Sequence, residues 1–223
     1  MKIPFSNKEK EEDVKCIRPP NLGWLEKKLS NQEIDYLWRC IKNKKEDYKK
    51  DLGGAVSVSS NNKLLDRGDW FWTNTVVPLC MKYGNEFSNL GYKVPTQSIH
   101  TMCMSSWWVN LQKKYEFVAL HEHKGIYSFV IWLKIPTQSK QQKKNPIASG
   151  GDDAYTYISN FGFEYPNILG ESTTHLYQMN PEMEGMMLFF PSKLKHVVYP
   201  FFNCDETRIS ISGNISLDTS KKV

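Results

Sequence analysis

The sequence predicts a mainly β protein in which helices precede the sheet-forming part. After Val94-Pro95, short apolar or alternating runs recur between Gly, Pro, Asn and charged residues. This pattern is typical of a β-sandwich or barrel. Before that point, two longer stretches have helical spacing of their apolar residues. A chain of 223 residues can form one substantial core. We expect one structural domain, with an arm and supporting helices over residues 1–95 and the β core over residues 96–223.

The first part of the chain predicts an arm and two helices that pack outside the sheets. Residues 1–20 are polar and charged and end in two prolines, so we expect a loosely held arm. Apolar residues at helical spacing predict a helix from residue 23 to about 50. Within it, Ser30 with a glutamate three residues later has the pattern of a capping box. A second helix is expected over about 70–89, with Pro78 at its start or at a kink.

Eight runs in the second part predict strands, with turn residues between them. A polar, low-complexity loop over about 137–154 follows the third of these runs. It is too long for a simple connector, and it is either a lid over a site or plain disorder. The runs are SIHTMCMSSWWVNLQ, FVALHEH, YSFVIWLKI, AYTYISNF, THLYQM, GMMLFF, HVVYPF and TRISISGNIS.

Three histidines in these runs are candidate metal ligands. His121 and His123 stand two residues apart on a predicted strand, so both rings point to the same side, while Glu122 points to the other. His196 is expected to open a later strand and to face inward. Three imidazoles with open positions suit Fe(II), Zn or Cu, whereas Mg and Ca prefer oxygen ligands. The alternative is that each histidine is a satisfied core or surface residue.

Arg208 follows twelve positions after the third histidine, in the alternating run TRISISGN. Alternation places Arg208, Ser210 and Ser212 on one face and the isoleucines on the other. A core-facing guanidinium needs a partner, because it is costly to bury unpaired. The carboxylate of an anionic ligand such as a 2-oxo acid, with Ser210 donating a hydroxyl, would satisfy it. The alternative is a structural salt bridge to Glu or Asp.

These segments together resemble those of the 2-oxoglutarate- and Fe(II)-dependent oxygenases. The resemblance covers about residues 105–217 and is closest to a prolyl-hydroxylase-like branch common in marine bacteriophage and bacterial genomes. It lies in the segments WWVNLQKKYEFVALHEHKGIYSFVIWLKIP, EGMMLFFPSKLKHVVYPF and ETRISISGNI.

The resemblance implies a double-stranded β-helix (jelly roll) and an iron bound by His121 and His196. It also implies that Arg208 and Ser210 hold the far carboxylate of the cosubstrate 2-oxoglutarate. Asn110, on the same strand face as Trp108, looks like a polar residue of that pocket. Gln112 is a further candidate for this role.

This chain departs from the superfamily at one position. His123 stands where most members have Asp or Glu, so the expected ligand set is His121, His123 and His196. The change removes one negative charge from the metal site, which leaves open whether iron is the native metal. No catalytic side chain beyond the metal ligands is expected.

The expected activity is hydroxylation of an unactivated C–H bond with dioxygen. A peptidyl proline is the first candidate substrate, and a free amino acid, a nucleobase or another small molecule would be tolerated equally. One rival is a three-histidine, cupin-like dioxygenase or isomerase that needs no 2-oxoglutarate. An Arg208 that points outward or pairs with Glu would favour it. Another rival is a non-catalytic jelly-roll binding protein or virion protein.

Composition limits the partners and the location. The formal net charge is only +5, so nucleic acid is a possible partner that the charge does not indicate. The apolar runs are too short to span a membrane, and the first residues have no secretory signal. Five widely spread cysteines without a CxxC pair are typical of reduced thiols. We therefore expect a cytoplasmic protein, in the host cytoplasm if a phage encodes it. The oligomeric state is not predicted.

Overall fold

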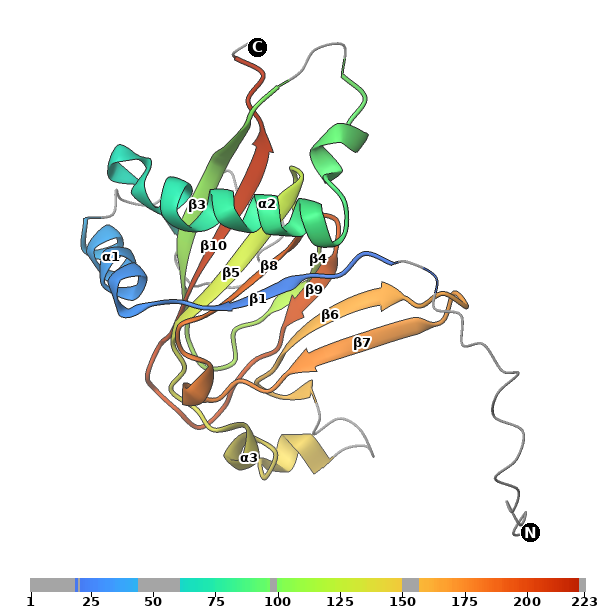
Figure 1. Ribbon diagram of the computed structural model, residues 1–223. Helices are drawn as coiled ribbons and strands as arrows, with labels where there is room; N and C mark the ends of the chain where they lie inside the picture. The colour runs from blue at the N-terminus through green and yellow to red at the C-terminus, as the bar shows by residue number, and fades with distance from the viewer. Residues whose placement is uncertain (1–18, 20, 44–60, 97–99, 150–156, 221–223) are drawn as a thin grey trace, which may run out of the picture.

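The computed structural model describes residues 19, 21–43, 61–96, 100–149 and 157–220, which form two antiparallel sheets (Figure 1). The larger sheet has the strand order β1-β8-β5-β10-β3-β2, and the smaller has the order β4-β9-β6-β7. This architecture confirms the prediction of a mainly β fold. The strands are β1 Leu25–Lys28, β2 Asn61–Lys63, β3 Met102–Gln112, β4 Val118–His121, β5 Tyr127–Lys134, β6 Phe161–Pro166, β7 Ser172–Tyr177, β8 Met186–Pro191, β9 Lys195–Val198 and β10 Arg208–Leu217.

The central strand β5 explains how the layers are held together. Its apolar run at residues 129–133 lies between β8 and β10 and is buried on both faces. Phe129 and Ile131 on one face pack against the helices, in the larger hydrophobic core. Val130 and Trp132 on the other face pack with residues of the smaller sheet. An uninterrupted apolar strand is expected where both faces of a sheet are covered.

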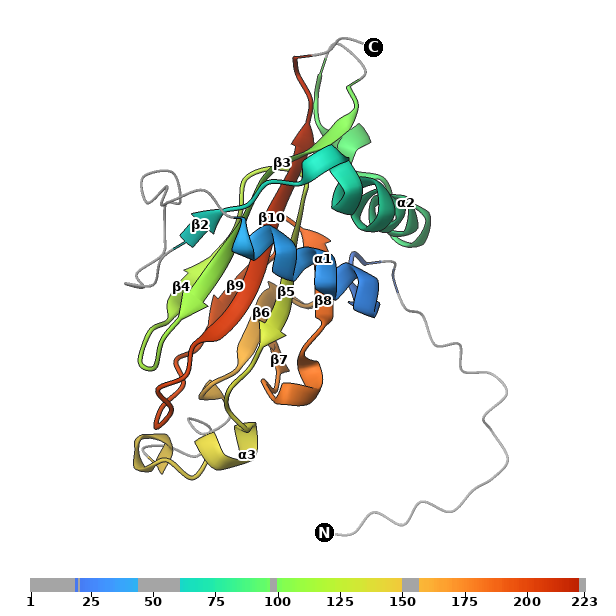
Figure 2. The same ribbon diagram turned by 90° about the vertical axis from the view of Figure 1, so that its left-hand side faces the viewer.

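Two helices cover the outer face of the larger sheet (Figure 2). They are α1, Asn31–Lys42, and α2, Val77–Glu86, which continues from a π-helical segment at Trp72–Val76. The predicted capping box at Ser30 is confirmed, with hydrogen bonds in both directions between Ser30 and Glu33. Pro78 lies in the first turn of α2, directly after the π-helical segment, where its missing N–H and its ring interrupt the regular α-helical hydrogen bonds.

The first predicted helix is wrong over its first residues. Leu25–Lys28 form β1, which pairs with the edge of β8, and the helix begins only at Asn31. Residues 44–50 of that prediction lie outside the described part of the chain, as do residues 1–18 of the predicted arm. Two strands, β1 and β2, therefore come from the part of the chain for which only helices were predicted. The division near residue 95 stays a prediction.

Seven of the eight predicted runs contain a strand, and AYTYISNF does not begin one where expected. Residues 157–159 form a turn, and β6 starts at Phe161. Ser159 has a φ of 64°, in the left-handed region that interrupts an extended strand. Residues 154–156 lie outside the described part.

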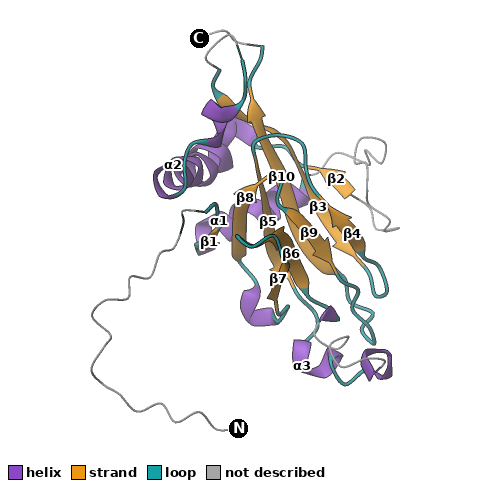
Figure 3. Cartoon of the chain, turned by 90° about the vertical axis from the view of Figure 1, so that its right-hand side faces the viewer, coloured by secondary structure: helices purple, strands orange, loops and turns teal. Residues whose placement is uncertain are grey.

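The predicted loop at 137–154 is partly ordered into short helices. These are α3, Ser139–Gln142, and a 3-10 turn at Pro146–Ser149. They lie beyond the ends of the strands, on the side away from α2 (Figure 3). The Gln142 side chain accepts from and donates to the backbone of Phe202, so this half of the loop is fixed. Residues 150–154 are outside the described part. Among the helices that are described, none has the length and apolarity to cross a membrane.

Candidate metal centre

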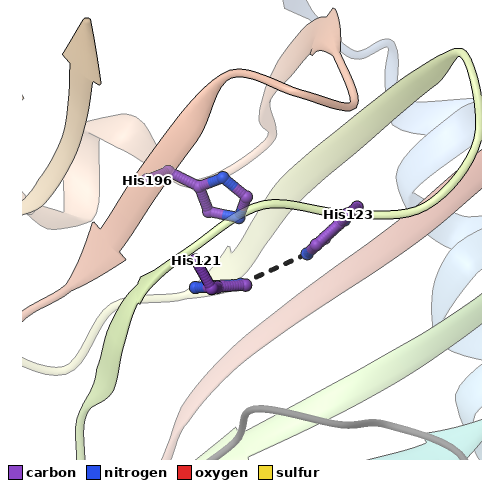
Figure 4. Close-up of side chains that lie close together, drawn as sticks. All are labelled: His121, His123 and His196. Carbon is purple, nitrogen blue, oxygen red and sulfur yellow. Dashed lines mark hydrogen bonds between the residues drawn. The ribbon is translucent and has the colours of Figure 1, made fainter.

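The structure brings His121, His123 and His196 together at one point between the sheets (Figure 4). His121 ends β4 and faces His196 directly across the β4–β9 pairing. The ring centroids of these two lie 4.2 Å apart, and the His123 ring lies 5.2 Å and 4.8 Å from them. One ring nitrogen from each histidine lies within 4.8 Å of the other two.

His123 reaches this point from a loop and not from a strand, which corrects the sequence prediction. Strand β4 ends at His121, after an irregular register. The backbone N–H of His123 donates to the carbonyl of Ser192 at 2.8 Å. Gly125 has a φ of 104°, and a Cβ there would lie 2.6 Å from the carbonyl oxygen of Ile215. The loop therefore follows a path that only glycine permits.

The hydrogen bonds of two rings define which nitrogens are free for a metal. His121 Nδ1 lies 2.7 Å from the carbonyl of Ala119, and His196 Nδ1 lies 3.0 Å from that of Leu194. A carbonyl oxygen only accepts, so both Nδ1 atoms carry the proton and both Nε2 atoms carry a lone pair. Such a contact to the second ring nitrogen is the usual support of a metal-binding histidine.

Burial keeps the three imidazoles neutral. It is the main cause that lowers the pKa of His121, lowers that of His123 to about 4, and lowers that of His196 well below its ordinary value. The neighbouring imidazoles lower the last two further. His196 is 4% exposed and lies against aromatic rings of Phe161, Phe163 and Phe190. Metal binding requires neutral histidines, so the protonation state fits a ligand role.

The spacing between two of these rings also fits one bound ion. The Nε2 atoms of His121 and His123 are 3.2 Å apart. Two nitrogens that are each about 2.1 Å from one ion lie about 3.0–3.4 Å apart. Without a proton or a cation between them, two lone pairs at this distance repel each other. The donor set therefore suits Fe(II), Zn or Cu.

Arg208 lies buried at the first position of β10 and is 2% exposed. Its Nη2 donates to the carbonyl and the hydroxyl of Ser159 at 2.9 and 2.7 Å, and its Nη1 lies 3.3 Å from Gln112 Oε1. The guanidinium also stacks over Phe201. Its Nε is buried and makes no hydrogen bond. Burial lowers the pKa of Arg208 to about 9, so the group stays charged at neutral pH.

No Asp or Glu among the described residues forms a salt bridge with Arg208. The structural ion pair that the sequence left open is thus not found there, and neither is the outward-pointing arginine that would favour an enzyme without 2-oxoglutarate. A buried cation without an acidic partner is costly, which points to an anionic ligand.

Polar side chains line the inner face of the larger sheet between the histidines and Arg208. We call this set the inner polar row. It consists of four pairs in register on β10 and β3: Arg208 with Gln112, Ser210 with Asn110, Ser212 with Trp108, and Asn214 with Ser106.

The predicted shared face of Asn110 and Trp108 is confirmed, because Trp108 Nε1 donates to Asn110 Oδ1 at 2.9 Å. The Asn110 amide donates to the hydroxyls of Ser210 and Ser212 at 3.3 and 3.1 Å. The roles of Asn110 and Ser210 in holding a cosubstrate remain predictions.

Three residues of the site were missed in the sequence. Ser128 is the one polar residue in the apolar run of β5 and is fully buried, which was a usable signal. Asn214 continues the alternation of Arg208, Ser210 and Ser212. Ser159 has no such signal, because its role depends on a left-handed turn.

Comparison with known proteins agrees with this geometry. Residues 106–214 match a family model described as "Putative 2OG-Fe(II) oxygenase". No curated protein matches the chain.

Three similar solved structures have the same fold. A prolyl-4-hydroxylase from Pseudomonas putida has a TM-score of 0.50 and 13% identity, covering 87% of this chain and 92% of its own. A 2OG-Fe(II) oxygenase family oxidoreductase from Burkholderia pseudomallei has a TM-score of 0.50 and 12% identity, covering 83% and 78%. A Trichoplax adhaerens prolyl hydroxylase, solved with a hypoxia inducible factor peptide, has a TM-score of 0.51 and 12% identity, covering 89% and 84%.

The fold is thus that of a jelly roll, and three histidines lie together inside the region that the family model matches. Residues 106–214, which include the three histidines and Arg208, thus belong to the 2-oxoglutarate- and Fe(II)-dependent oxygenases.

Proposed function

We propose that this oxygenase binds Fe(II) through Nε2 of His121, His123 and His196 and hydroxylates a C–H bond of its substrate. The observation that carries the proposal is the convergence of three neutral imidazoles on one point. The fixed protons on Nδ1 of His121 and His196 leave their Nε2 lone pairs available to the ion. Iron and 2-oxoglutarate, when bound, supply the oxidising chemistry.

We further propose that Arg208 holds the carboxylate of 2-oxoglutarate that lies away from the metal. Its Nε has no partner in the described structure, and a carboxylate oxygen would satisfy it. A guanidinium is well suited to grip a carboxylate through two N–H groups. Ser210 and Asn110 lie on the same inner face and would line the cosubstrate between Arg208 and the histidines.

The three-histidine set changes the charge of the centre. With neutral ligands the ion keeps its full charge of +2, whereas a carboxylate ligand would reduce it by one. Since 2-oxoglutarate is a dianion, one carboxylate would face this ion and the other would face Arg208. The phenyl rings around His196 exclude water from one side of the centre, which strengthens both attractions.

A proline residue in a peptide is our first candidate substrate. Support comes from the sequence resemblance to a prolyl-hydroxylase-like branch and from two solved structures of this fold, which are those of prolyl hydroxylases. At 12–13% identity these structures share the fold, so the substrate has to be tested directly.

The test begins with the centre and continues to the substrate. Anaerobic titration with Fe(II) and then 2-oxoglutarate should produce a weak visible charge-transfer band. The band should reach its maximum at one Fe(II) and one 2-oxoglutarate per protein molecule. Proline-containing peptides, free amino acids and nucleobases are then supplied with dioxygen, and the formation of succinate is measured. A product that is heavier by one oxygen atom identifies the substrate. Tight zinc binding without any 2-oxoglutarate binding would instead show a structural metal site.

The variant His175→Ala is a matched control for these measurements. His175 lies on β7 against the Trp24 ring and outside the three-histidine cluster. Its replacement should leave the band and the succinate yield unchanged.

A further inference from the structure

The three histidines of the site are held in two different ways. His121 and His196 each contact the carbonyl oxygen two residues before them, at Ala119 and Leu194. Their orientation is thus set by their own strands. The Nδ1 of His123 instead lies 3.0 Å from the hydroxyl of Ser128 on β5, so its orientation depends on a side chain from another element.

We infer that Ser128 and Asn214 are positioning residues that keep the proton of His123 on Nδ1 and its Nε2 aimed at the metal. The inference rests on the proposed function in treating His123 as a ligand. It assigns a task to two residues of the inner face that contact neither metal nor cosubstrate in that proposal.

The hydrogen bonds fix which atom donates and which accepts between Asn214, Ser128 and His123. Asn214 Nδ2 donates to Ser106 Oγ at 3.3 Å, which turns Asn214 Oδ1 toward Ser128. An amide oxygen only accepts, so the single proton of the Ser128 hydroxyl points to Asn214, at 2.9 Å. The Ser128 oxygen then has only lone pairs to offer His123, and His123 Nδ1 must be the donor.

The position of Ser128 makes this arrangement rigid. Ser128 is fully buried and is the register partner of Asn214 on β10, which in turn pairs with Ser106 on β3. The three side chains thus form one row across three neighbouring strands. A buried donor without an acceptor is costly, so an Nδ1–H without Ser128 would be strongly disfavoured in this orientation.

The hydrogen-bonded side chains of Ser128, Asn214 and Ser106 also favour an imidazole over a carboxylate at position 123. It presents an oxygen lone pair, which suits an N–H donor. A carboxylate at this position would face that lone pair unless Ser128 gave up its bond to Asn214. The Ser128 oxygen is therefore a suitable acceptor for the histidine that stands where an acidic residue is usual in the superfamily.

The experiment compares two matched pairs of variants by two measurements. Ser128→Ala removes the acceptor, and Ser139→Ala is its control, because Ser139 is also fully buried but its hydroxyl has no partner in the described structure. Asn214→Leu removes the acceptor behind Ser128, whereas Asn214→Asp keeps an oxygen there at similar size. The measurements are the tautomer of His123, from nitrogen-15 NMR of metal-free protein, and the affinity for Co(II) and Fe(II) in competition with a chelator.

The wild-type protein and Ser139→Ala should show His123 protonated on Nδ1. Ser128→Ala and Asn214→Leu should shift His123 toward the other tautomer and weaken metal binding by about 10- to 100-fold, the usual cost of altering a group behind a ligand. Asn214→Asp should retain the tautomer and most of the affinity.

Two results would overturn the inference. One is a Ser128→Ala protein that keeps the Nδ1 proton and binds metal as tightly as the wild type. The other is an equal loss for Asn214→Leu and Asn214→Asp, which also decides the case if Ser128→Ala fails to fold. If the wild type binds no metal but its tautomer still responds to Asn214→Leu, the proposed function fails and the positioning role stands.

Discussion

The two sheets contribute different kinds of groups to the site. The smaller sheet supplies His121 and His196 from the facing strands β4 and β9, and the loop after β4 supplies His123. The larger sheet supplies Arg208 and the rest of the inner polar row from β3 and β10. Neutral imidazole nitrogens thus face a sheet surface that carries hydroxyls, amides and one buried cation.

This difference predicts that metal binding and cosubstrate binding depend on different residues, which can be tested separately. Groups of the smaller sheet would set the affinity for the metal, whereas groups of the larger sheet would set the affinity for the dianionic cosubstrate. The exception is the hydrogen-bonded pair of Ser128 and Asn214. It belongs to the larger sheet, but Ser128 contacts His123. If the division is correct, most variants should change one affinity and spare the other.

The largest effect is expected for His121→Ala. This change removes one of three ligands, so stoichiometric binding of Fe(II) should be lost, a greater cost than the roughly 10- to 100-fold change for a group behind a ligand. 2-Oxoglutarate binding that depends on the metal should be lost with it. Calorimetry and the visible band measure both. Metal binding at wild-type affinity would remove His121 from the ligand set, and His175→Ala serves as the control.

Replacement of the buried cation should affect only the cosubstrate. Arg208→Met keeps much of the volume but removes the charge, and loss of one partner of a buried charged pair costs about 2–5 kcal/mol, or at least about 30-fold in 2-oxoglutarate affinity. Metal affinity should stay close to that of the wild type. Stability should change little, because the cost of burying the guanidinium is removed together with its hydrogen bonds to Ser159 and Gln112.

The control for that variant is Arg67→Met, at an exposed arginine. An Arg208→Met protein that loses metal and cosubstrate equally, or that melts well below the wild type, would indicate a folding role for Arg208.

The two sheets also differ in how far the sequence predicts them. Alternation along β10 and β3 correctly predicted the shared face of Arg208, Ser210 and Ser212 and that of Trp108 and Asn110, because a regular strand allows no other arrangement. Each of the two runs that carry the histidines contains a strand, as predicted, but β4 ends at His121 and leaves His123 outside it.

Alternation could not predict residues that lie where regular structure ends. His123 leaves the strand at a loop that Gly125 permits, and Ser159 reaches Arg208 from a left-handed turn. Edge strands were missed for a related reason, since the short β1 pairs only with β8 and its helix-compatible residues were read together with α1. Local sequence does not encode such distant pairing partners.

A smaller effect is expected from pH on the metal-free protein. The pKa of His123 lies near 4 in the folded protein, and the ordinary value is 6.5. Between these values the unfolded chain binds a proton that the folded protein does not, so the free energy of unfolding should decrease as pH falls from about 6.5 toward about 4. The lowered pKa values of His121 and His196 add to this in the same direction.

Urea unfolding in the presence of a chelator, at several pH values from about 7.5 to 5, measures this slope. His121→Ala should show a shallower slope, because one imidazole is absent and His123 loses a neighbour that lowers its pKa. A free energy of unfolding that is constant below pH 6.5 would mean that the three rings are not buried together as neutral groups.

The smallest effect is expected in the middle of the inner polar row. Asn110 accepts from Trp108 and donates to Ser210 and Ser212, so most of its hydrogen bonds are already made within the protein. Asn110→Ala should therefore weaken 2-oxoglutarate binding by only about 0.5–1.5 kcal/mol, the net value of one hydrogen bond, and leave metal affinity unchanged. Ser105→Ala on the exposed face of the same strand is the control. The Trp108 ring lies 5.7 Å from the ring of His123. If Asn110→Ala weakens metal binding together with cosubstrate binding, a change at Trp108 also affects the metal site. The two sheets would then not act independently.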